Sequence, residues 1–120
     1  MTKVIIQISH PPFGHENAYS GLFVALGSLP KGIDVVVILT GDGVYTGRKG
    51  QVDPLKNINL PSTEEQIGDI LNMGGRVIAD RQALSMRGIG TEELIEGIEV
   101  LGTHDIQDII LDYGDHVLAF

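Results

Sequence analysis

Short apolar runs that are typical of buried strands alternate along this chain with segments that have helical spacing. Residues 33–40 (IDVVVILT) give the strongest strand signal, and residues 3–9 form a similar run of β-branched side chains. Residues 15–28 lie between these runs, and their large apolar side chains recur on one helical stripe. Because nearly continuous β-branched runs suit strands that are covered on both faces, the sequence predicts βαβ units and a mostly parallel sheet.

The second half of the chain continues the alternation. A helix is expected from Pro61, where Ser62 and Glu65 have capping-box spacing, and Gly74 should end it. Three further strands are expected at residues 76–80, 97–101 and 116–120, with helical segments at 81–86 and from 103 onward. We therefore predict a flavodoxin-like three-layer α/β/α sandwich with about five strands, formed by one domain over residues 1–120.

The charge of the chain restricts its partners. Sixteen acidic residues against eight lysines and arginines give a formal net charge of −8. Nucleic-acid binding requires basic side chains that neutralise phosphates, so we expect no nucleic-acid partner. No run approaches the length of a membrane span and no signal peptide is evident, so we expect no membrane association and a cytoplasmic location.

The candidate binding residues follow from the fold class. In open parallel sheets, ligands bind outside the carboxyl ends of the strands. Here that edge would be built from residues 9–16, 41–51 and 80–90. The polar and glycine residues of these stretches that we select as candidate ligand-binding residues are His10, His15, Asp42, Gly43, Asp80, Arg81 and Arg87.

Neither a metal nor a nucleotide cofactor is predicted at this edge. His15 and Glu16 are adjacent and would diverge on a helix, so they form no preset ligand pair. A zinc site would need a third ligand, for which His10 or Asp42 is the nearest candidate. The glycines of TGDGVYTGRKG follow neither the dinucleotide-binding nor the P-loop spacing. We therefore interpret Gly41-Asp42-Gly43 as a turn, and we expect no cofactor and no metal.

A glycine-rich polar segment without clear periodicity covers residues 41–60. A loop of this length inside a small domain is usually functional, mobile or packed against a partner. It also holds Arg48 and Lys49, one of two basic spots on an otherwise acidic chain. The segment is one reason to expect a homo-oligomer.

Several short motifs, taken in order, resemble one known family. They are VVVILTGDGV at the second strand, V-I-x-D followed by Arg87-Gly88-Ile89, ELIEGIEVLG, and HVLAF at residues 116–120. Their order and spacing are similar to those of the DsrE/DsrF/DsrH-like family, small subunits of sulfur relays that include the TusBCD group. The resemblance implies a homotrimer or homohexamer, or mixed rings with cysteine-bearing paralogues.

The same resemblance singles out Asp80. Active members of the family carry a cysteine at the end of the third strand, seven residues before the Arg-Gly pair, and counting back from Arg87 gives Asp80. This chain contains no cysteine. Persulfide transfer needs a thiolate as nucleophile and carrier, which a carboxylate cannot replace. We therefore assign no catalytic residue, and expect Asp80 to cap the following turn or to pair with a nearby arginine.

Three functions remain open from the sequence. The first is a non-catalytic sulfur-relay-family subunit that acts in assembly, scaffolding or regulation. The second is a binder of a small anion or other small ligand, held at the strand-end rim near Arg48, Arg81 or Arg87. The third is a non-thiol enzyme that uses Asp80 together with His10 or His15. Without a thiol, the sequence favours a protein that is not an enzyme.

Overall fold

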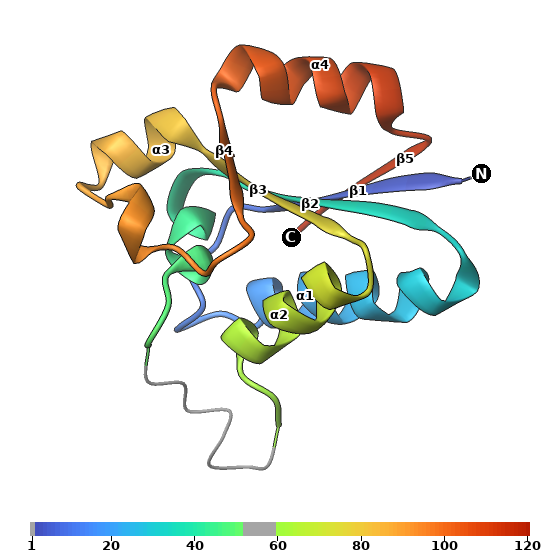
Figure 1. Cartoon of the computed structure of the whole chain (residues 1–120), viewed down its shortest axis with the longest axis horizontal. Helices are drawn as coiled ribbons and strands as arrows, with labels where there is room; N and C mark the ends of the chain where they lie inside the picture. Colours follow the sequence, from blue (N-terminus) through green and yellow to red (C-terminus); the bar gives the residue numbers. More distant parts are fainter. Residues whose placement is uncertain (1, 52–59) are drawn as a thin grey trace.

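The protein forms a five-stranded, all-parallel sheet with helices on both faces, in a computed structural model that describes residues 2–51 and 60–120 (Figure 1). The strands are β1 (Lys3–Ile8), β2 (Asp34–Leu39), β3 (Arg76–Asp80), β4 (Glu99–Leu101) and β5 (His116–Ala119). The α-helices are α1 (Asn17–Ser28), α2 (Thr63–Asn72), α3 (Arg81–Met86) and α4 (Thr103–Tyr113). Short 3-10 helices are η1 (Leu29–Lys31), η2 (Gly41–Gly47) and η4 (Thr91–Glu93). The predicted three-layer α/β/α class is confirmed.

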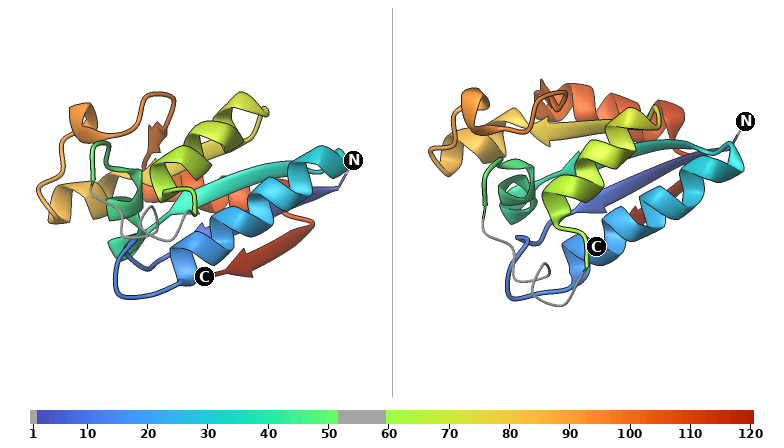
Figure 2. Two further views of the ribbon diagram at one scale, coloured as in Figure 1. Left: turned by 90° about the horizontal axis from the view of Figure 1, so that it is seen from below. Right: turned by 60° about the horizontal axis from the view of Figure 1, so that its bottom comes forward.

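The strand order is β4-β3-β2-β1-β5. From β1 to β4 the chain moves one strand at a time in a single direction, and then returns past the whole sheet to place β5 beside β1. Because crossovers between parallel strands are right-handed, connections that move in opposite directions lie on opposite faces. Accordingly α1 and α2 cover one face, called here the two-helix face, and α4 covers the other, the α4 face (Figures 1 and 2).

Each face has its own apolar core. On the two-helix face, alternate side chains of β1, β2 and β3 pack against α1, α2 and α3. On the α4 face, Ile5, Ile38 and Ile78 pack against Ile106 and Ile109 of α4. All three strand isoleucines are fully buried, which fixes the pleat of the central strands. The parallel pairing of these strands places their carboxyl ends at one edge of the sheet.

Two local expectations from the sequence have different outcomes. The predicted cap of α2 is confirmed, because the Ser62 hydroxyl accepts a hydrogen bond of 3.0 Å from the backbone N–H of Glu65. The prediction of an irregular loop over residues 41–60 is wrong for Gly41–Gly47, which form η2. Residues 52–59 of that predicted loop lie outside the described residues. Within the described ranges, the structure has no helix that is both long and apolar enough to cross a membrane.

Candidate functional site

The carboxyl edge of the sheet gathers three connections that carry most of the polar candidates. β1 leads into residues 9–16, β2 leads into η2, and β3 leads directly into α3. These are the stretches that the sequence selects as a binding rim. Their side chains form three separate polar groups.

The first group joins the loop after β1 to the end of β5. The Nδ1 atom of His10 lies 3.0 Å from the backbone oxygen of Phe120. The rings of His10 and His15 lie 5.0 Å apart between centroids and are tilted by 59°. The structure therefore brings together the two histidines that the sequence selects.

The second group is an ion pair between the loop after β2 and the end of α3. The Nε atom of Arg87 donates to Oδ1 of Asp42 at 3.0 Å, and a second guanidinium nitrogen donates to the backbone oxygen of Ala83 at 3.0 Å. Arg87 is mostly covered, with 22% of its side chain exposed, whereas Asp42 is 59% exposed. These contacts hold η2 against α3, and they pair the charge of Arg87 with a carboxylate of the same chain.

Gly43 explains why η2 can lie so close to the first strand. A Cβ atom at this position would overlap the backbone oxygen of Ile8, the last residue of β1. Only glycine leaves room for this approach. Gly43 therefore has a packing role in the described structure, and its neighbour Asp42 is held at the rim as a consequence.

The third group surrounds Asp80, the last residue of β3. Asp80 is the N-cap of α3, and its Oδ1 atom accepts a hydrogen bond of 3.0 Å from the backbone N–H of Gln82. The Thr103 hydroxyl, at the start of α4, donates to the same oxygen at 3.3 Å. Asp80 thus joins the start of α3 to the start of α4, and the expected cap is present.

Arg81 and Arg87 do not share this group. A guanidinium nitrogen of Arg81 donates to the backbone oxygen of Val100 in β4 at 3.3 Å, whereas Arg87 is bonded to Asp42 and Ala83. The contacts of Asp80 run to Gln82 and Thr103 rather than to either arginine. The two arginines therefore bond to different elements: Arg81 to β4, and Arg87 to η2 and α3.

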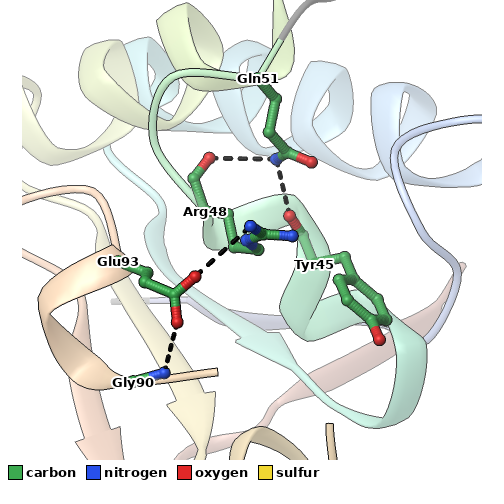
Figure 3. A network of polar contacts seen from close by, with 5 residues as sticks. All are labelled: Tyr45, Arg48, Gln51, Gly90 and Glu93. Carbon is green, nitrogen blue, oxygen red and sulfur yellow. Dashed lines mark hydrogen bonds and ion pairs between the residues drawn. The ribbon is translucent and has the colours of Figure 1, made fainter. Parts of the chain in front are cut away.

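A further polar network lies beside the rim, and sequence analysis did not identify it (Figure 3). One carboxylate oxygen of Glu93 accepts a hydrogen bond of 2.7 Å from the backbone N–H of Gly90, and the other lies 3.3 Å from Arg48. The amide nitrogen of Gln51 donates to the backbone oxygens of Tyr45 and Arg48 at 2.7 and 3.0 Å.

Backbone bonds strengthen this network. The N–H of Lys49 donates to the oxygen of Glu93 at 2.9 Å, and the N–H of Ile95 donates to the oxygen of Gly47 at 2.8 Å. The spacing of Gly90 and Glu93, three residues apart at the start of η4, is the sequence signal that could have indicated part of it. Arg48, a candidate for anion binding, is therefore paired with Glu93.

Among residues 2–51 and 60–120, no three His, Asp or Glu side chains are grouped so that they could hold a metal ion. Hydrogen bonds from Arg76 hold the pKa of Glu99 below its ordinary value of 4.5, against an opposing effect of burial. The rim thus consists of capped, paired and hydrogen-bonded polar groups.

The fold and the rim together define a class of protein. It is a parallel α/β domain whose third strand ends at a capping residue, beside two loops that contain glycine. The family model of the DsrE/DsrF-like family matches residues 2–120. The chain belongs to the DsrE/DsrF-like family.

Two relatives match nearly the whole chain. The chain is 32% identical to "Uncharacterized protein MK0008" of Methanopyrus kandleri over 117 residues, which cover 98% of this chain and 93% of the relative. It is also 32% identical to "Uncharacterized protein MJ0989" of Methanocaldococcus jannaschii over 118 residues, which cover 98% and 99%.

Solved structures share the fold. The ychN protein of E. coli superposes with a TM-score of 0.88 at 24% identity, with all of both chains covered. MTH1491 of Methanobacterium thermoautotrophicum, described as a protein of unknown function, superposes with a TM-score of 0.72 at 15% identity, again over both whole chains. At these identities the likeness concerns the fold alone.

Proposed function

We propose that this protein is a non-catalytic subunit of the sulfur-relay type, which works in the cytoplasm by assembly with other chains. Its role would be scaffolding or regulation, in a homotrimer or homohexamer or in a ring with cysteine-bearing paralogues. The observation that carries the proposal is Asp80. In a chain without cysteine, the residue at the end of β3 is a carboxylate that caps α3 and accepts a hydrogen bond from Thr103.

The chemistry of Asp80 supports this role. Sulfur carriage in a relay needs a thiolate that attacks and then holds a sulfur atom, and a carboxylate forms no comparable link. Oδ1 of Asp80 is bonded to Gln82 and Thr103, which suits a structural cap more than a base. Asp80 stands at the strand end where the resemblance to active members places a cysteine, and its hydrogen bonds join α3 to α4.

The two alternatives gain less support from the contacts. Anion binding at the rim would need available cations, yet Arg48 is paired with Glu93 and Arg87 with Asp42, which leaves Arg81, bonded to the backbone oxygen of Val100, as the third candidate. An enzyme that used Asp80 with His10 would need the two groups to meet. In the described structure Asp80 bonds toward α4, whereas His10 bonds toward Phe120.

The test measures assembly and the chemistry of position 80 together. We expect the purified protein to be oligomeric by light scattering at micromolar concentration, and a strict monomer would contradict the proposal. We expect Asp80→Cys to fold, since cysteine is smaller and tolerates burial. The Gln82 N–H should then stabilise the thiolate and lower the thiol pKa below the free value of about 8.5, as measured by alkylation rate against pH.

Ser85→Cys provides the matched control. Ser85 lies in the same short helix but is exposed, so its thiol should titrate near the free value. A thiol at position 80 that titrates like the control would contradict the expectation that the Gln82 N–H stabilises a thiolate at this strand end. Any turnover by the wild-type protein that is lost in Asp80→Asn would favour an enzyme instead.

A further inference from the structure

The two edges of the sheet differ in how well they are closed. β4 has three residues, Glu99 forms an ion pair with Arg76, and the backbone oxygen of Val100 accepts a hydrogen bond from Arg81. Short length and charged side chains are common ways in which proteins block the pairing of an edge strand. The β4 edge is therefore a poor template for another strand.

β5 is one residue longer than β4, and it contains no Asp, Glu, Lys or Arg side chain. β5 pairs with β1 alone, and all four of its residues, His116–Ala119, are exposed. Val117 and Leu118 are apolar side chains that are 45% and 40% exposed. β5 is the outermost strand of the sheet in Figure 2. It contains no proline and no lysine that would oppose the approach of another strand.

The hydrogen-bond pattern shows which backbone groups of β5 are open. The N–H of Phe120 donates to the oxygen of Gln7, and its oxygen accepts from the N–H of Ser9, so both groups of Phe120 face β1. Backbone groups in a strand alternate in direction from one residue to the next. The N–H and C=O of Leu118 therefore also face β1, whereas those of Val117 and Ala119 point away from the sheet.

The outward backbone groups of β5 are complementary to those of β5 in a second copy of the chain. In an antiparallel pair related by a two-fold axis, Val117 of one copy would lie opposite Ala119 of the other, and each such pair exchanges two hydrogen bonds. Leu118 of the two copies would meet at the axis, in the closely spaced position between the bonded pairs. In this register the N–H and C=O groups of Val117 and Ala119 all form hydrogen bonds to the other copy, in one symmetric arrangement.

We propose that β5 is a self-association surface, at which two copies pair their β5 strands antiparallel about Leu118 and join their sheets. The inference rests on the assembly part of the proposed function and names its surface. A two-fold contact of this kind is isologous, so it fits a dimer or a hexamer made of two trimers and does not fit a closed trimer alone. Four strand residues make a small interface, so we expect the dimer contact to weaken on dilution.

The first experiment blocks the edge without touching the intrachain ladder. Ala119→Pro removes an N–H that points outward, and edge strands tolerate proline at such positions. The loss of two backbone hydrogen bonds per dimer should raise the dimer dissociation constant about tenfold or more. Light scattering over a dilution series measures the shift, and circular dichroism checks that the variant is folded. Leu111→Ser, which changes an exposed apolar residue of α4, is the control and should leave assembly unchanged.

The second experiment does not depend on the proline variant folding. Since the chain has no cysteine, Leu118→Cys introduces a single thiol. Opposed side chains of an antiparallel pair have Cβ atoms about 4.5–5.5 Å apart, near the range for a disulfide. We expect rapid disulfide-linked dimers under mild oxidation for Leu118→Cys, and few for Leu111→Cys, although position 111 on α4 is the more exposed of the two.

The outcomes separate the two proposals. An oligomer whose mass is unchanged by Ala119→Pro, and in which Leu118→Cys links no faster than Leu111→Cys, would overturn the β5 surface and leave the assembly role standing. A wild-type protein that is monomeric at every concentration would contradict both. Linking at Leu118→Cys that Ala119→Pro abolishes would support the proposed register.

Discussion

The two faces of the sheet are covered to different degrees. On the two-helix face, all three inward side chains of β1 (Val4, Ile6 and Ile8) are buried, and β2 is equally covered there. On the α4 face, Ile5 and Ile38 are buried, but Val36 is only partly covered and Asp34 is exposed. A hollow of about 230 Å³ opens at the amino ends of the strands, lined in part by Val36 and Arg76.

The chain path explains the difference. Connections that move from β1 toward β4 place helices repeatedly on the two-helix face, whereas only the return to β5 crosses the other face, through α4. One helix of 11 residues covers the middle of a sheet but leaves its margins open. The faces should therefore respond unequally to matched substitutions.

The largest expected effect compares two neighbouring valines of β2. Val37 points into the two-helix face and is fully buried, so Val37→Asp would bury an unpaired carboxylate and lower the free energy of unfolding by more than about 3 kcal/mol, or prevent folding. Val36→Asp, on the α4 face, should cost only about 1–2 kcal/mol because the new charge can reach water. Equal losses in thermal unfolding would show that the faces are equally closed.

The second test concerns the seating of η2, whose Val44 belongs to the core of the two-helix face. Gly43→Ala places a methyl group against the backbone oxygen of Ile8, and should lower the free energy of unfolding by about 2–3 kcal/mol. Gly27→Ala is the matched control, since a Cβ at this exposed position of α1 meets no atom within 4 Å. It should stabilise the protein by up to about 1 kcal/mol. A neutral Gly43→Ala would mean that η2 can move away from β1.

The third test uses the buried amide of Gln66 in α2. Its side chain is 1% exposed, and in the described part of the chain neither its nitrogen nor its oxygen has a hydrogen-bond partner. Gln66→Met keeps the length of the side chain, and should raise the free energy of unfolding by about 1 kcal/mol. Gln107→Met, at an exposed position of α4, should change little. A destabilised Gln66→Met in chemical denaturation would indicate that the amide binds ordered water.

The smallest effect is expected for the Arg76–Glu99 pair. Because Arg76 lowers the pKa of Glu99 in the folded state, the pair stabilises the protein above the unfolded pKa, and this contribution is lost as the pH falls through the folded pKa. Both side chains are more than 40% exposed, so Glu99→Gln should cost less than about 1 kcal/mol at pH 7. The difference between wild type and variant should shrink toward pH 3 in denaturant titrations, and a constant difference would exclude the ion pair as its cause.

Sequence patterns predicted the elements that are determined by residues close together in the chain. The run at residues 33–40 became β2 at Asp34–Leu39, and the helix expected over residues 15–28 became α1 at Asn17–Ser28. Apolar periodicity and capping chemistry act within a few residues, so they can be read directly. η2 was not predicted because its position depends on the contact of Gly43 with β1, which no local sequence pattern indicates.

The candidate site was predictable only in part, for a related reason. The place of Asp80 at a strand end, and its capping role, follow from residues next to it in the chain. Its bond to Thr103 spans 23 residues, and the pair of Asp42 with Arg87 spans 45. Such partners meet only once the strand order is known, and alternation alone does not determine that order.

The position of β5 beside β1 also bears on synthesis of the chain. The partner of β1 is the last strand of this sheet along the chain, so Val4 to Gln7 acquire their second set of backbone bonds only after residues 116–119 have left the ribosome. Until then the nascent domain presents β1 as an open edge, and closing it requires contact between segments more than 100 residues apart, residues 4–7 and 116–119. Chains that stop before His116 would expose a central, strongly apolar strand, and we expect them to aggregate rather than to accumulate as shortened domains.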